Sequence, residues 1–170
     1  MSQGVSVLPL TAEHLESFHA CLDAVARERQ WIGLVQAPPL ESTRQHVLAS
    51  LDKGNIHFLA LDTGKVVCWC DITRLEREGS RHCGRLGIGL LPGYRGRGAG
   101  RRLMESAISR ALEVGLERVE LEVYASNATA IGLYEKLGFV REGAKRKGRF
   151  LDGRYEDVIL MALFLPTPAG

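Results

Sequence analysis

The chain has 170 residues, of which 45% are hydrophobic and 25% charged, and its formal net charge is +2. These proportions are typical of one globular domain with enough chain to bury a core. So small a net charge argues against nucleic acid as a partner. No apolar run approaches the ~18 residues of a membrane span, and no secretory signal is visible at the start. We predict a cytoplasmic protein with no membrane or nucleic-acid partner, one domain over residues 1–165 and a flexible tail over 166–170.

The four cysteines do not have the spacing of a zinc site. Cys68 and Cys70 alternate within an apolar segment, where small thiols are commonly buried. We predict that they pack in the core and that the chain binds no metal.

The first half of the chain shows one short strand, two helices and a hairpin. A strand is predicted over 5–9, and a helix over 12–29, with Thr11 as its N-cap. After a proline-containing loop, the string Ser42-Thr-Arg-Gln45 reads as a capping box that opens a second helix. The two apolar segments 56–61 and 66–73, with Asp62 to Lys65 between them, predict a hairpin.

The second half alternates strands and helices. The expected elements are a strand ending at Leu90, a helix over 100–114, a strand over 118–124, a helix from Asn127 to Leu137, and strands over 139–147 and 154–165. The resulting order is β-α-α-β-β-β-α-β-α-β-β. This order predicts an α+β fold with a mixed, mostly antiparallel central β-sheet and helices on both faces.

A glycine-rich turn lies between the central strand and its helix. Gly96, Gly98 and Gly100 leave the backbone bare where a helix start presents unpaired N–H groups and a positive dipole end. Such a nest, surrounded by arginines, is suited to phosphate oxygens. The alternative is a tight basic turn that contacts only water. Neither the nucleoside-triphosphate P-loop string nor the Rossmann fingerprint is present.

Two strings together resemble the GNAT superfamily of N-acetyltransferases. Arg95-Gly-Arg-Gly-Ala-Gly100 matches the family's Arg/Gln-x-x-Gly-x-Gly/Ala signature, and Asn127 to Phe139 is similar to its Asn-x-x-Ala…Tyr-x-x-x-Gly-Phe string. The tail from Glu142 to Met161 is similar to branches that acetylate amino acids, polyamines or protein N-termini. The resemblance implies a GNAT-like fold and acetyl-CoA as the acetyl donor.

The resemblance also implies where the donor binds. It places the pantetheine along the central strand and the pyrophosphate on the turn that follows. The implied donor-binding residues are Ile88, Gly89, Leu90, Arg95, Gly96, Arg97, Gly98, Ala99, Gly100, Arg101, Asn127 and Tyr134. The bare face formed by Gly87 and Gly89 fits either close approach of a ligand or packing of the helix over 100–114.

Asn127 and Tyr134 are seven residues apart and therefore lie on one helix face. By the resemblance, Asn127 helps to hold pantetheine and Tyr134 protonates the departing thiolate. Asn127 also suits a plain N-cap, and Tyr134 suits a packed aromatic position.

The acceptor amine needs a base, because its pKa in solution lies near ~10. Glu120 and Glu122 lie off the core face of their strand, and Asp71 and His82 are further candidates. A water relay remains an alternative. We predict Tyr134, Glu120 and His82 as the catalytic residues.

The acceptor site is predicted from less specific signals. The loop with Trp31, together with Glu122 and the last two strands, is expected to bind the acceptor. The basic run from Lys145 to Arg149 suits an acidic acceptor, the ribose phosphate or a solvated hairpin tip. The predicted activity is transfer of an acetyl group to a small primary amine of the amino-acid or polyamine type. The alternatives are an acetyltransferase of protein N-termini and a non-catalytic coenzyme A sensor. The resemblance to the family also implies a homodimer.

Overall fold

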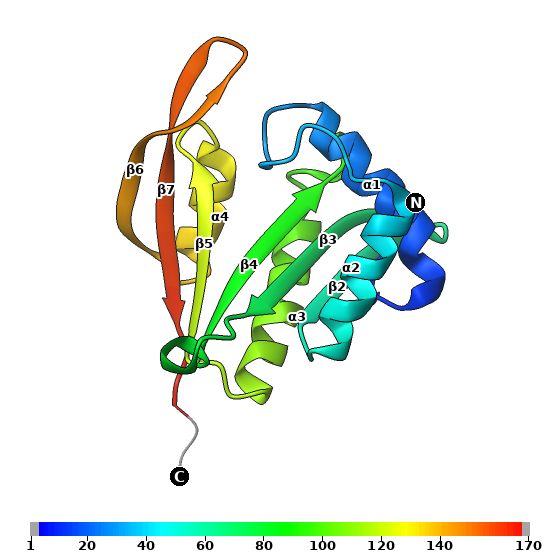
Figure 1. Cartoon of the computed structure of the whole chain (residues 1–170), viewed down its shortest axis with the longest axis horizontal. Helices are drawn as coiled ribbons and strands as arrows, with labels where there is room; N and C mark the ends of the chain where they lie inside the picture. The colour runs from blue at the N-terminus through cyan, green and yellow to red at the C-terminus, as the bar shows by residue number, and fades with distance from the viewer. Residues whose placement is uncertain (1–3, 168–170) are drawn as a thin grey trace.

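The computed structural model describes residues 4–167, which contain one seven-stranded sheet with strand order β1-β2-β3-β4-β5-β7-β6 (Figure 1). Neighbouring strands pair antiparallel except β4 and β5, which are parallel. The parallel pair is joined by a helical crossover, as parallel strands require. The predicted mixed α+β fold is therefore confirmed. Of the predicted tail, residues 168–170 lie outside the described residues.

The strands are β1 (Ser6–Pro9), β2 (Ile56–Asp62), β3 (Lys65–Arg74), β4 (Cys83–Leu90), β5 (Arg118–Tyr124), β6 (Val140–Leu151) and β7 (Arg154–Phe164). The helices are α1 (Leu15–Arg27), α2 (Leu40–Asp52), α3 (Ala99–Glu113) and α4 (Ala128–Lys136), with short 3₁₀ turns at Ala12–His14, Glu78–Ser80 and Pro92–Tyr94. Among the described residues, no helix has the length and apolarity needed to cross a membrane.

The two faces of the sheet carry separate cores. Helices α3 and α4 cover one face, and α1 and α2 cover the other (Figure 1). Strand β3 contributes to both, because successive side chains point to opposite faces. Cys68 and Cys70 are fully buried against the α3 side, whereas Trp69 packs with Phe18 of α1. The expected packing of the two cysteines is confirmed.

Three predicted boundaries are wrong. The helix expected over 12–29 begins with a 3₁₀ turn, and its α-helical part ends at Arg27. Helix α2 begins at Leu40, directly after Pro39, so the string at Ser42 lies inside the helix and is not its cap. Pro39 is itself the N-cap residue, and its carbonyl accepts the Thr43 N–H at 3.0 Å. Strand β6 continues four residues beyond Lys147, to Leu151.

Candidate active site

The site is organised by a split in the middle of the sheet. Strands β4 and β5 pair only through Cys83/Arg118, Gly84/Val119 and Arg85/Glu120, and then diverge (Figure 1). The second half of β4, Ile88 to Leu90, therefore has no partner strand on its β5 side. An unpaired strand edge can bind an extended ligand through its backbone N–H and C=O groups.

The glycine turn follows at the open end of this split. Gly96 and Gly98 have φ values of +69° and +83°, a region that side chains other than glycine rarely adopt. The first helical hydrogen bond runs from the Arg102 N–H to the Gly98 carbonyl, at 3.1 Å. None of the N–H groups of residues 96–101 makes a well-formed hydrogen bond within residues 4–167. These free donors at the start of α3 fit a pyrophosphate group.

The side chain of Arg95 points away from the turn. Its guanidinium makes a two-point ion pair with Glu28, at 2.6 and 2.8 Å, and donates to the Leu90 carbonyl at 2.7 and 3.0 Å. The ring of Trp31 lies 5.4 Å from the guanidinium carbon, and its N–H donates to Glu28. The Arg95 pairing lowers the pKa of Glu28. Arg95 thus ties the end of β4 to the end of α1, and the structure leaves only its backbone for a phosphate.

Tyr134 lies on the α3 and α4 face of the split. It is buried on α4, with its ring centroid 5.9 Å from that of Phe139. Burial and the nearby Cys70 thiol raise the pKa of Tyr134 above its usual value, so the phenol stays protonated. Asn127 caps α4 by accepting the Ala130 N–H at 3.2 Å, as its N-cap interpretation expected. Among the described residues the amide nitrogen of Asn127 makes no hydrogen bond, which leaves it to a ligand.

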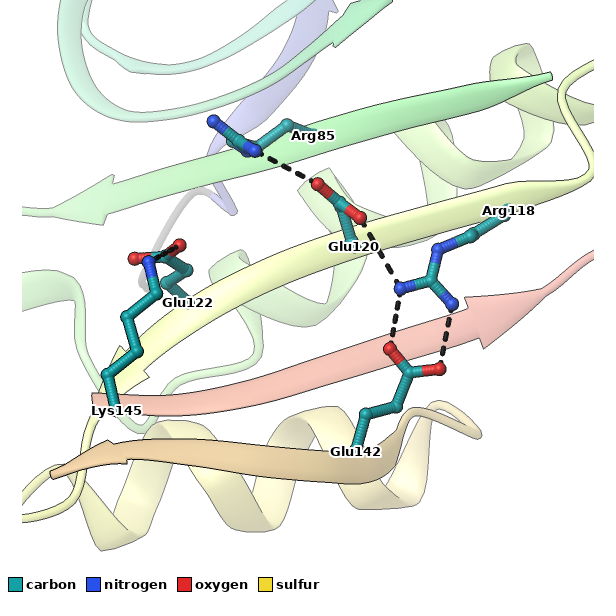
Figure 2. A network of polar contacts seen from close by, with 6 residues as sticks. All are labelled: Arg85, Arg118, Glu120, Glu122, Glu142 and Lys145. Carbon is teal, nitrogen blue, oxygen red and sulfur yellow. Dashed lines mark hydrogen bonds and ion pairs between the residues drawn. The ribbon is translucent and has the colours of Figure 1, made fainter. Parts of the chain in front are cut away.

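Glu120 and Glu122 lie on the opposite face of β5, and Figure 2 shows how differently they are held. Glu120 is part of the last β4–β5 pair and contacts two guanidinium groups, Arg85 at 3.0 Å and Arg118 at 3.3 Å. Glu122 lies two residues further along β5, where β4 has diverged. Among the described residues its only ion pair is with Lys145. Glu120 therefore braces the closed end of the split, whereas Glu122 lies beside its opening.

The face of β4 formed by Gly87 and Gly89 was expected to contact either a ligand or the helix over 100–114, and in the structure it contacts side chains of β3. A Cβ at Gly89 would lie 2.0 Å from the ring of Trp69, and a Cβ at Gly87 would lie 3.1 Å from the Asp71 carboxylate. These side chains come from β3, which pairs with β4 in this register. The bare positions therefore accommodate Trp69 and Asp71, and α3 packs on the other face.

His82 is not brought to this region. It lies just before β4, at the closed end of the split, and is exposed. Its carbonyl accepts hydrogen bonds from the N–H groups of Glu117 and Arg118. Since a strand rises about 3.3 Å per residue, His82 lies roughly 25 Å from Leu90. Its backbone role in the turn before β5 accounts for its position.

The β6–β7 hairpin bends over the open end of the split. The basic run is not its tip: between Lys145 and Arg149 the strand bulges, with Lys147 at φ +51° and its N–H bonded to Asp157 at 2.7 Å. Beyond the bulge, Arg149 donates to the Arg29 carbonyl at 2.7 Å and stacks on Tyr124. These contacts hold the hairpin against the end of α1 and border a cavity of about 950 Å³.

The comparisons with known proteins agree with this architecture. Residues 18–139 match the family model described as "Acetyltransferase (GNAT) family", and the chain belongs to this family. It is 46% identical over 78 residues to the [Ribosomal protein bS18]-alanine N-acetyltransferase of Escherichia coli K12, which covers 45% of the chain and 51% of that relative. The chain thus spans about half the length of this relative.

Two further relatives match over nearly the whole chain. The L-amino acid N-acetyltransferase AaaT of Escherichia coli K12 is 29% identical over 158 residues, covering 90% of the chain and 96% of the relative. The crystal structure of a GNAT-family acetyltransferase from Streptococcus pneumoniae superimposes with a TM-score of 0.89 and 28% identity, covering 95% of this chain and 99% of that one.

Proposed function

We propose that this protein transfers an acetyl group from acetyl-CoA to a primary amine of a small molecule. The observation that carries the proposal is the split between β4 and β5, which opens to both faces of the sheet. An unpaired strand edge and a nest of free N–H groups border it. Tyr134 lies on one face of the split and Glu122 on the other.

The donor would be held mainly by backbone. The N–H groups of residues 96–101 would bind the pyrophosphate. The edge of Ile88 to Leu90 would pair with the pantetheine through its other backbone groups, since the Leu90 carbonyl is held by Arg95. The Asn127 side-chain N–H would donate to the pantetheine, since its carbonyl oxygen caps α4. Acetyl-CoA supplies an acetyl group activated as a thioester.

We assign Glu122 as the base for the acceptor. An amine is an ammonium ion at neutral pH and must lose a proton before it attacks a carbonyl. Glu120 is paired with two arginines at the closed end, whereas Glu122 is half-exposed beside the opening. The pair between Glu122 and Lys145 is exposed, and such pairs are weak enough to be exchanged for a ligand.

Tyr134 would act on the leaving group. Glu122 takes one proton from the ammonium ion, and the neutral amine nitrogen then forms a bond to the acetyl carbon. The carbon–sulfur bond breaks, and the nitrogen releases its second proton to solvent as the amide forms. The raised pKa of Tyr134 makes complete proton transfer to a thiolate unfavourable, since thiols titrate near ~8.5. We therefore propose that the Tyr134 hydroxyl donates a hydrogen bond to the thiolate as it forms. The thiolate then takes its proton from solvent. The products are an amide and free coenzyme A.

The direct test is an assay of thiol release from acetyl-CoA with a panel of amines, amino acids and N-terminal peptides. Release that depends on a small amine, with acetylation of that amine, supports the proposal. Acetylation restricted to peptides would favour an N-terminal acetyltransferase. Tight binding of coenzyme A without acetylation of any acceptor would favour a sensor, and either result would contradict the proposal.

Donor binding has a matched pair of variants. Gly98 and Gly115 both have positive φ, +83° and +80°, and open space where a Cβ would lie, but they flank opposite ends of α3. Alanine at either position costs about 1 kcal/mol of stability. Only Gly98→Ala should weaken acetyl-CoA binding, measured by calorimetry, because only that residue shapes the nest. Equal affinities of the two variants would contradict the nest assignment.

A further inference from the structure

On the face of the sheet that α1 and α2 cover, one row of residues runs across neighbouring strands. In this row the carboxylate of Asp71 lies on one side of β4 and that of Glu122 on the other. His57, Asp71 and Gly87 face one another on β2, β3 and β4. Continuing the β4–β5 register beyond Arg85/Glu120 brings Glu122 opposite Gly87, across the split. With strands about 4.8 Å apart, the backbones of Asp71 and Glu122 are separated by at least roughly 10 Å.

Asp71 is a largely buried carboxylate that contacts the glycine face of β4. It lies deep in the protein, yet part of its surface remains accessible. Its carboxylate lies over Gly87, with its nearest oxygen 3.1 Å from where a Cβ would lie. Within residues 4–167 it makes no ion pair and no side-chain hydrogen bond. Burial without a partner raises the pKa of Asp71 to about 7.

The neighbours of Asp71 do not supply a positive charge. Burial lowers the pKa of His57 to about 4, so this ring is neutral. Its Nε2 also has no hydrogen-bond partner within residues 4–167. On β4 the guanidinium of Arg85 is turned to Glu120, and across the split Lys145 is paired with Glu122. A buried carboxylate without a partner is costly, and an incoming cation would relieve that cost.

We propose that the acceptor is a small diamine, whose second ammonium group binds Asp71 while the first is acetylated beside Glu122. This inference rests on the proposed acetyltransferase function and narrows its acceptor class. Amino acids fit the row less well, because their carboxylate would face the buried carboxylate of Asp71.

Three acceptors of equal chain length test the proposal: putrescine, butylamine and γ-aminobutyrate. They carry at the far end an ammonium group, a methyl group and a carboxylate, respectively. The steady-state kcat/KM for coenzyme A release should be highest for putrescine, by about 10- to 100-fold over butylamine, as expected for a charged hydrogen bond. Asp71→Asn should remove most of this ratio, whereas Asp52→Asn, an exposed aspartate at the end of α2, should keep it.

The outcomes separate the two proposals. If no amine releases coenzyme A, the acetyltransferase function itself fails. If the kcat/KM for butylamine or γ-aminobutyrate equals that for putrescine, the acetyltransferase function stands and the diamine inference is overturned. The inference is also overturned if Asp71→Asn lowers kcat/KM equally for all three acceptors. The KM for acetyl-CoA of Asp71→Asn should equal that of the unmodified protein, which shows that the fold is intact.

Discussion

Replacing Asp71 with asparagine should stabilise the protein, and more so as the pH rises. The pKa of Asp71 is raised from 3.8 to about 7 in the folded protein. Below pH ~4 the carboxyl group is protonated in both folded and unfolded chains. Between pH ~4 and ~7 the unfolded chain ionises first, so the free energy of unfolding falls as the pH rises. Asparagine has the same shape and does not titrate.

The size of the effect follows from the pKa shift. A shift of about 3 units corresponds to roughly 4 kcal/mol, lost almost completely by pH 8. Because part of the carboxylate is accessible and solvent screens it, we expect about half of this value, roughly 2 kcal/mol. For a domain of this length that difference raises the melting temperature of Asp71→Asn by about 4–8 °C at pH 8.

Thermal unfolding of both proteins between pH 4 and pH 8 measures this difference. Asp23→Asn is a control of opposite sign. Arg27 and the Ala37 N–H lower the pKa of Asp23, so its carboxylate stabilises the folded protein. This stabilisation is present above the usual aspartate pKa and is lost as the pH falls. A melting-temperature difference for Asp71→Asn that stays constant with pH, or that turns negative at pH 8, would refute the assignment of Asp71 as a buried carboxylate without a partner.

Three further substitutions test the site. Tyr134→Phe should lower kcat by at least about tenfold with little change in acetyl-CoA affinity, and an unchanged rate would remove its assigned role. Glu122→Gln should lower kcat/KM by about 100-fold and Glu120→Gln by much less; comparable losses in two folded variants would show that the base is misassigned. Gly89→Ala should cost about 1–3 kcal/mol in denaturant unfolding, because its methyl group collides with an indole ring, whereas Gly93→Ala, with open space around it, should cost little. Equal costs would show that the ring moves freely.

The glycine turn and the elements beside it could be predicted because their signals are local. Positive φ at Gly96 and Gly98, and the cap at Asn127, follow from which residues tolerate those conformations. The bounds of β5 agree because its alternation is strict over the whole strand. Local chemistry of this kind does not depend on which strand lies next to which.

The details of the acceptor side could not be predicted, because they depend on contacts between residues far apart in the chain. Arg95 turns to Glu28, which is 67 positions away, and Arg149 reaches the carbonyls at the end of α1. Glu120 and Glu122 are equivalent in the strand pattern, and only the point at which β4 diverges distinguishes them. The alternation of β3 likewise gave no sign that Asp71 would lie over Gly87.

The most direct test of the account is to follow the acetyl group itself. The protein is incubated with isotopically labelled acetyl-CoA and putrescine, and the products are identified by mass spectrometry. The account predicts label in an amide of putrescine, with one coenzyme A thiol released for each amide formed. Label that remains in acetyl-CoA, or that appears only as free acetate, would contradict it.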